Sequence, residues 1–156
     1  MTQDCAICEL HRDGPPKEKY EISRNELWVL RHHPDPAPLL GWLVLDTVRH
    51  CPGALAFSNE EAANWGPAVR DASALVQRLT QCDRIYSIAF GEFAQHLHMH
   101  LIPRFVTEPA TTAWAIADHY RAVVSAQLPG ADPRAIEDLV QRARVLSMDQ
   151  ARSLEA

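Results

Sequence analysis

The sequence predicts an α+β fold, in which an antiparallel sheet of about five strands carries one long helix and a helical extension at the C-terminus. Five short apolar runs end at turn residues, with one helical segment among them, as in sheets joined by hairpins rather than in alternating βα units. After residue 110 the periodicity is helical. The 156 residues are 47% hydrophobic, enough for one core. We therefore expect a single domain over 1–156, with its core at about 5–106 and the extension at about 110–150.

The strands are predicted from short apolar runs, most of which end at glycine, proline or charged residues. Asp13–Pro16 contains the turn signal Asp-Gly-Pro-Pro, and three prolines predict a loop over His32–Pro38. Pro103 is expected to end the last strand. The five predicted strands are Tyr20–Ile22, Leu27–Leu30, Gly41–Val48, Arg84–Phe90 and His96–Ile102.

The helices are predicted from their caps and from apolar spacing. Ser58 followed by Glu61 is a capping box, and the apolar residues after it recur at helical spacing, which predicts a helix over Asn59–Thr80. Two further helices are expected at Thr112–Ala126 and Asp132–Leu146.

Composition excludes several classes of protein. A net charge of -5 argues against a surface that binds nucleic acid polymers, although a local site could still hold a small phosphorylated ligand. No apolar run has the length of a membrane span, and Met1–Glu9 lacks the features of a secretory signal. We therefore expect a cytoplasmic protein without membrane contact. Four cysteines in this context suggest metal binding rather than a disulfide scaffold.

Three histidines, His96, His98 and His100, alternate with apolar residues. On a strand this spacing predicts three rings on one face, about 7 Å apart, with the apolar residues between them in the core. Solvated rings are the plainest interpretation. A His-x-His pair could also hold zinc with a further ligand. In a third interpretation, a neutral imidazole attacks a phosphorus or acyl centre, while protonation of one ring discourages protonation of its neighbours.

The cysteines Cys5 and Cys8 have the spacing of one zinc knuckle. A tetrahedral site needs two further ligands, and Cys51 is not favoured as one of them. Cys82 is expected to be a small buried residue. A redox motif is disfavoured, because the pair does not open a helix after a strand.

The segment His96–Ile102 resembles the signature of the histidine triad (HIT) superfamily of nucleotide hydrolases and transferases, in which three histidines alternate with apolar residues. The resemblance covers about residues 5–104. Gly41–Leu45 followed by Arg49 and His50 is similar to the family's Gly-His strand and basic-His turn, and the N-terminal Cys-x-x-Cys is common among bacterial members. The resemblance implies a HIT-like fold and a homodimer.

The resemblance also implies roles for the three histidines. His98 would attack the α-phosphorus of a nucleoside phosphate conjugate, such as a dinucleoside polyphosphate or nucleoside phosphoramidate, to give a nucleotidyl-histidine intermediate that water resolves. His100 would hydrogen-bond phosphate oxygens or the leaving group, and His96 would orient the site. No catalytic metal is implied. In zinc-containing relatives the Cys-x-x-Cys pair is completed by the histidines that correspond to His50 and His96, which implies a structural Zn²⁺ held with Cys5 and Cys8.

The chain departs from the family pattern around the substrate. Gly91, Glu92 and Phe93 stand where relatives have a phosphate-contacting Gly-Gln-Thr or Gly-Gln-Ser, and an anionic Glu92 would repel phosphate unless it is protonated or turned away. Asp35 is the candidate for the acidic residue that grips the ribose, and Arg104 could reach a phosphate.

Other residues have plainer expectations. Trp42 replaces the histidine that follows the family's strand glycine. It is expected to serve in packing, like the other tryptophans, Trp28, Trp65 and Trp114. Four further histidines are expected to face water, with a pocket position for His32 or His33 as the lesser alternative. The four are His11, His32, His33 and His119.

Three functions follow from these observations. The first is a HIT-type hydrolase or nucleotidyl transferase. The second is a nucleotide-binding regulatory module with little turnover, which Glu92 and Trp42 would indicate. The third is a metalloenzyme with His98 and His100 as ligands of a catalytic metal.

Overall fold

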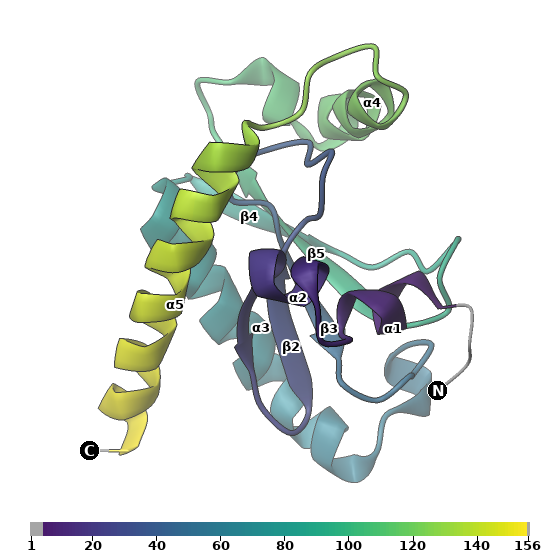
Figure 1. Cartoon of the computed structure of the whole chain (residues 1–156), viewed down its shortest axis with the longest axis vertical. Helices are drawn as coiled ribbons and strands as arrows, with labels where there is room; N and C mark the ends of the chain where they lie inside the picture. The colour runs from purple at the N-terminus through teal and green to yellow at the C-terminus, as the bar shows by residue number, and fades with distance from the viewer. Residues whose placement is uncertain (1–4, 156) are drawn as a thin grey trace.

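A five-stranded antiparallel sheet lies at the centre of the chain in the computed structural model (Figure 1). The structure describes residues 5–155, with side chains for 5–149, so the two ends of the predicted domain lie outside the described residues. The strand order β1-β2-β3-β5-β4 confirms the predicted α+β class. The strands are β1 Glu21–Arg24, β2 Trp28–His32, β3 Leu43–Thr47, β4 Arg84–Ile88 and β5 His98–Arg104.

The long helix α3 has the predicted bounds, Asn59–Thr80, and the predicted cap. Ser58 Oγ accepts a bond from the Glu61 amide at 3.1 Å, and Glu61 Oε2 accepts one from the Ser58 amide at 2.7 Å. These bonds satisfy two backbone donors that a helix start leaves unpaired. The other helical segments are α1 Ala6–Leu10, α2 Pro15–Tyr20, η1 Ala54–Ala56, η2 Pro109–Thr111, α4 Ala113–Val124 and α5 Pro133–Glu155.

The predicted turn at Asp13–Pro16 was wrong in part, because Pro15 and Pro16 begin α2. Proline suits the first turn of a helix, where its missing N–H is not needed. Because α2 includes Tyr20, strand β1 begins at Glu21, one residue later than expected.

The prediction that Pro103 ends the triad strand was also wrong, since β5 continues to Arg104. The pairing with β3 stops at Leu101, while the pairing with β4 continues through Pro103. One side of the strand is therefore free of the ladder at this position, and a residue without an N–H is tolerated there.

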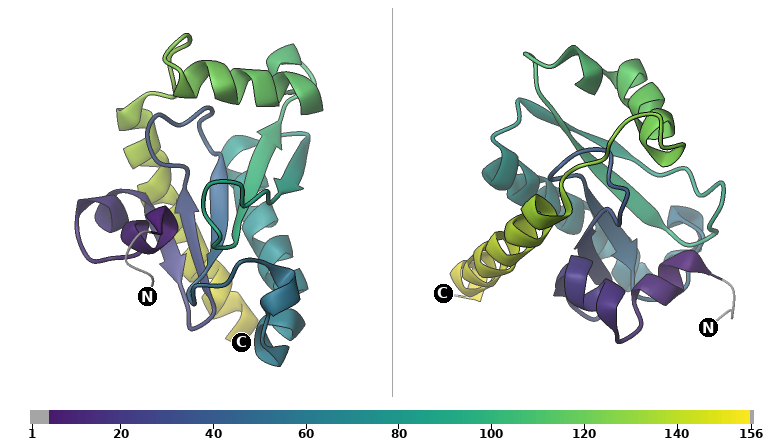
Figure 2. Two further views of the ribbon diagram at one scale, coloured as in Figure 1. Left: turned by 90° about the vertical axis from the view of Figure 1, so that its right-hand side faces the viewer. Right: turned by 45° about the horizontal axis from the view of Figure 1, so that its top comes forward.

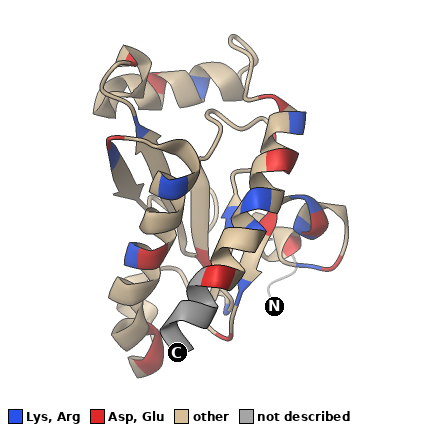
Figure 3. Cartoon of the chain, turned by 90° about the vertical axis from the view of Figure 1, so that its left-hand side faces the viewer, with Lys and Arg blue, Asp and Glu red and all other residues tan. Residues whose placement is uncertain are grey.

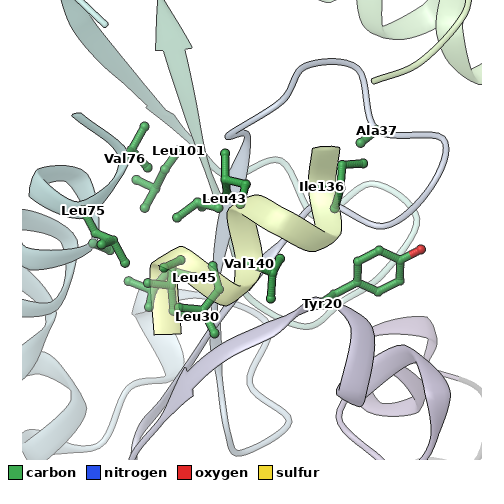
Figure 4. Close-up of a cluster of buried hydrophobic side chains, with 14 of the residues drawn as sticks. Tyr20, Leu30, Ala37, Leu43, Leu45, Leu75, Val76, Leu101, Ile136 and Val140 are labelled. Carbon is green, nitrogen blue, oxygen red and sulfur yellow. The ribbon is translucent and has the colours of Figure 1, made fainter. Parts of the chain in front are cut away.

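One face of the sheet packs against α3 and α5 to form the main core (Figure 4). Leu43 and Leu101, both fully buried, come from the sheet. Leu75 of α3 and Ile136 of α5 meet them. Figure 3 shows acidic and basic residues at intervals along α3 and α5. In the described part of the chain, none of the helices combines the length and apolarity needed to cross a membrane.

The opposite face of the sheet, which we call the triad face, carries His98 and His100. His98 pairs in register with Asp46, and His100 with Val44, and register partners of an antiparallel pair project to the same face. A smaller core lies here, in which Ile116 of α4 packs against Val44. Figures 1 and 2 show α4 near one end of the sheet and α1 near the other.

Candidate active site and metal centre

His98 and His100 lie side by side on β5, and both are half-buried. Their ring centroids are 5.3 Å apart, with the planes at 78°. His96 differs from them, because it precedes the strand, is fully buried and turns toward α1. The three rings are therefore unequal in their surroundings.

The ring of His98 is oriented by a backbone carbonyl. Its Nδ1 lies 2.6 Å from the His96 carbonyl oxygen, which can only accept a hydrogen bond. The proton of the neutral ring is therefore on Nδ1, and Nε2 carries the free lone pair. Such a ring can act as a nucleophile at Nε2.

His100 lies in an aromatic cluster formed by three other rings, those of His33, Trp42 and Tyr120. Trp42 Nε1 donates a hydrogen bond to His100 Nδ1 at 3.0 Å, and His33 lies 5.9 Å from the rings of both His100 and Tyr120. Burial, followed by the charges of His33 and His98, lowers the pKa of His100 to about 3. Burial likewise lowers the pKa of His33 to about 4. Both rings are neutral at pH 7.

A buried ion pair lies on the triad face beside His98. Asp46 Oδ2 accepts from Arg31 Nε at 2.6 Å, and Oδ1 accepts from Nη2 at 3.2 Å. His11 Nε2 lies 2.9 Å from the same Oδ2. Burial alone would raise the pKa of Asp46, but the charge of Arg31 and the bonds from His11 and Arg31 outweigh it and lower this pKa. Asp46 is 0% exposed and Arg31 4%.

This ion pair was missed in the sequence, although a signal was present. Asp46 interrupts the apolar run that predicts β3, and Arg31 ends another. A charge within a buried strand usually has a partner.

Four side chains form a compact metal-ligating cluster between α1, β3 and β5. The ligand atoms of Cys5, Cys8, His50 and His96 all lie within 4.8 Å of one another. Cys8 Sγ is 3.5 Å from His50 Nδ1 and 3.4 Å from His96 Nδ1, and Cys5 Sγ is 3.7 Å from the latter.

These separations fit a tetrahedral zinc site. Bonds of about 2.3 Å to sulfur and about 2.0 Å to nitrogen place tetrahedral ligands about 3.5 Å apart. His96 Nε2 lies 2.8 Å from the Thr47 carbonyl oxygen, so the ring donates there and presents Nδ1 to the cluster. Burial, then the hydrogen bond and charge of Cys5, raise the pKa of Cys8, an effect that a bound cation would reverse. Burial lowers the pKa of His96, which favours the neutral, ligating ring.

The two remaining cysteines do not belong to this cluster. Cys51 is buried, and its thiol donates to the Gly53 carbonyl oxygen. Cys82 is 3% exposed and belongs to the main core.

The predicted substrate residues lie in different settings. Gly91 is half-buried with φ at +72°, which favours glycine, whereas Glu92 and Phe93 are exposed. Asp35 accepts from Lys19 Nζ and the Tyr20 hydroxyl, and the pKa of Asp35 is lowered because these bonds outweigh burial. Arg104, the last predicted substrate residue, donates to Thr111 Oγ1 and to the Glu108 carbonyl oxygen.

The expectation that four further histidines face water was wrong for His32, which is fully buried, while the other three are half-buried and bind protein groups through a ring nitrogen. His32 is 0% exposed, its Nδ1 donates to the His33 carbonyl oxygen, and its Nε2 accepts from the Gly41 amide. Burial lowers the pKa of His32 to about 4. His33 lines the aromatic cluster, and His119 lies 2.9 Å from the Pro38 carbonyl oxygen. The fourth histidine, His11, binds the Asp46 carboxylate. Nearby protein oxygens thus take the place of water as hydrogen-bond partners of these rings.

Comparisons with solved structures identify the fold. A zinc-bound histidine triad family protein from Mycobacterium smegmatis superposes with a TM-score of 0.68 at 14% identity, covering 97% of this chain and 99% of that one. A hypothetical histidine triad nucleotide-binding protein from Sulfolobus tokodaii gives 0.66 at 16% identity, with 90% and 89% covered. A Hit-like protein involved in cell-cycle regulation from Bartonella henselae gives 0.64 at 14% identity, with 93% and 97% covered.

No protein-family profile matches the sequence. No curated protein matches it either. The superpositions nevertheless show that the chain has the fold of the histidine triad proteins, as the family resemblance implied.

Proposed function

We propose that this protein is a HIT-type nucleotide hydrolase or nucleotidyl transferase that acts at the α-phosphate of a nucleoside phosphate conjugate. Dinucleoside polyphosphates and nucleoside phosphoramidates are the expected substrates. The observation that carries the proposal is the 2.6 Å contact between His98 Nδ1 and the His96 carbonyl oxygen. It leaves the His98 Nε2 lone pair directed away from the backbone and free for attack.

In the proposed reaction, the His98 Nε2 lone pair forms a bond to phosphorus while the bond to the leaving group breaks. The leaving group departs with that electron pair and takes a proton from water. The ring is then cationic, and the His96 carbonyl stabilises its Nδ1–H. Water next attacks the same phosphorus, the N–P bond breaks, and its electrons return to Nε2 as the nucleotide leaves and a proton passes to solvent. His100 stabilises the charge on the phosphate oxygens.

Substrate contacts are proposed for the residues around the rings. Gly91, Glu92 and Phe93 would offer backbone N–H groups to phosphate, and the exposure of Glu92 lets its carboxylate turn toward water. Asp35 and Arg104 could bind substrate after exchanging their present partners.

We further propose that Cys5, Cys8, His50 and His96 hold a structural Zn²⁺. When bound, this ion would fix the His96 ring, whose backbone carbonyl orients His98. Metal analysis should find about one zinc per chain in the wild type and in His98→Ala, and little in Cys8→Ser. Loss of metal in His98→Ala would instead favour a metalloenzyme that uses the triad rings as ligands.

The reaction is tested with a panel of nucleotide conjugates and intact-mass measurement at neutral pH. A nucleotide adduct should form on the wild type and be absent in His98→Ala. His119→Ala is the matched control, because His119 lies on α4 and bonds to the Pro38 backbone carbonyl rather than to the triad. If the wild type binds nucleotides but gives neither adduct nor turnover with any conjugate, the chain is a binding module. Light scattering tests the proposed homodimer.

A further inference from the structure

The hydrogen bond between Trp42 and His100 joins the residue just before β3 to the triad strand β5. Trp42 Nε1 is 3.0 Å from His100 Nδ1, and the two rings meet edge to face at 86°. Trp42 is only 4% exposed, and Tyr120 of α4 packs against it at 5.8 Å. The indole is therefore held in place from both sides, and water has little access to this bond.

The chemistry of an indole fixes the protonation of its partner. Indole N–H is a donor only and never an acceptor. His100 Nδ1 therefore has to present a lone pair, and a neutral ring that accepts at Nδ1 carries its proton on Nε2. His98 has the opposite arrangement, because the His96 carbonyl can only accept from its Nδ1. Two adjacent triad rings are thus held in opposite tautomers by two different partners.

We propose that Trp42 is a positioning residue that holds His100 as the Nε2–H tautomer, so that His100 donates a hydrogen bond to substrate instead of presenting a second lone pair. The identity of the acceptor, a phosphate or leaving-group oxygen, rests on the proposed function. The tautomer itself does not, because it follows from the ligand-free geometry.

The alternative tautomer would oppose catalysis. With the proton on Nδ1, His100 would lose the bond from Trp42 and turn a lone pair toward the anionic oxygens that surround the α-phosphorus. Lone pairs facing phosphate oxygens repel them, whereas an N–H donor stabilises their charge. Trp42 therefore separates the functions of two chemically identical side chains: His98 supplies the nucleophile and His100 the donor.

The tautomer is measured by long-range ¹H–¹⁵N correlation spectra of imidazole rings, at pH 8 without substrate. His100→Gln identifies the signal. The wild-type ring should show an unprotonated Nδ1 and a protonated Nε2. A proton on His100 Nδ1 in the wild type would overturn the proposal. This measurement does not depend on whether a variant of Trp42 folds.

Variants test whether Trp42 is the cause. Trp42→Phe removes the N–H and is expected to release His100 into a mixture of tautomers and to lower kcat about 3- to 10-fold with little change in KM, as for one lost hydrogen bond. Trp42→His keeps a ring N–H and should recover part of kcat. Trp28→Phe is the matched control. Trp28 is 5% exposed, lies on the other face of the sheet, and its Nε1 has no hydrogen-bond partner among the described residues.

The outcomes separate this proposal from the proposed function. Trp28→Phe should leave both the tautomer and kcat unchanged. A wild-type tautomer in Trp42→Phe, or an unchanged kcat in that variant, would refute the positioning role. If no conjugate is turned over by the wild type, the proposed reaction fails, while a shift of the His100 tautomer confined to Trp42→Phe still supports the assignment of Trp42.

Discussion

Replacement of Asp46 by asparagine tests the buried ion pair on the triad face. The substitution preserves the size of the side chain and removes its charge, which leaves the Arg31 guanidinium without a counterion at 4% exposure. Breaking a buried pair from one side costs about 3–5 kcal/mol. Asparagine still accepts one hydrogen bond, so we expect about 3 kcal/mol at pH 7. For a chain of this size that lowers Tm by about 6–12 °C.

The assay is urea unfolding, followed by circular dichroism. The exposed pair Arg121–Asp118 supplies the control, since both side chains are more than half exposed. Asp118→Asn should cost about 0–0.5 kcal/mol. In a second comparison, Arg31→Met combined with Asp46→Leu should recover most of the loss, because a well-packed apolar pair avoids the desolvation penalty.

The pH dependence gives an independent check. The folded-state pKa of Asp46 lies below its ordinary value of 3.8. Its contribution is therefore complete above about pH 5 and is lost as the pH falls through the folded-state pKa. The difference in the free energy of unfolding between wild type and Asp46→Asn should therefore shrink as the pH falls below about 5. A loss at pH 7 as small as that of Asp118→Asn, about 0–0.5 kcal/mol, would refute the reasoning.

Two further predictions concern packing and backbone conformation. Leu139→Ala should lower the free energy of unfolding by about 2–5 kcal/mol, because this side chain is 1% exposed in the main core, whereas Leu55→Ala, at 104% exposed, should have little effect; similar losses in chemical denaturation would contradict the core assignment. Gly41→Ala should destabilise by about 2–4 kcal/mol, since φ is +81° and a Cβ would lie 2.3 Å from Thr80 Cγ2, while Gly53→Ala meets nothing within 4 Å. Equal melting temperatures for the two glycine variants would show that the backbone at Gly41 adapts.

The parts of the fold that were predicted correctly depend on local signals. The capping box at Ser58 and the helical spacing after it define α3 within neighbouring residues, and its bounds were confirmed. The alternation of His98 and His100 with apolar residues likewise fixes which face they occupy, once a strand is assumed.

The parts that were missed depend on contacts between distant residues. Helices as short as α1, with five residues, have no stability of their own, and tertiary packing determines whether they form. The buried ring of His32 accepts a hydrogen bond from the amide of Gly41, nine residues later. The sequence could not show that Trp42 meets His100, which is 58 positions away. The grouping of the Cys-x-x-Cys pair with two histidines was implied by the family resemblance rather than by spacing.

The interior position of β5 has a consequence for motion at the site. His100 and Leu101 pair with β3 on one side and β4 on the other, so their amides should exchange with deuterium only when the sheet opens as a whole. His100 therefore stands on a part of the chain that should open slowly, whereas His98 pairs with β3 alone. Glu92 and Phe93 lie in an exposed loop just before the triad. Under the proposed function, this loop would adapt to leaving groups of different size, while the sheet would keep His100 in place.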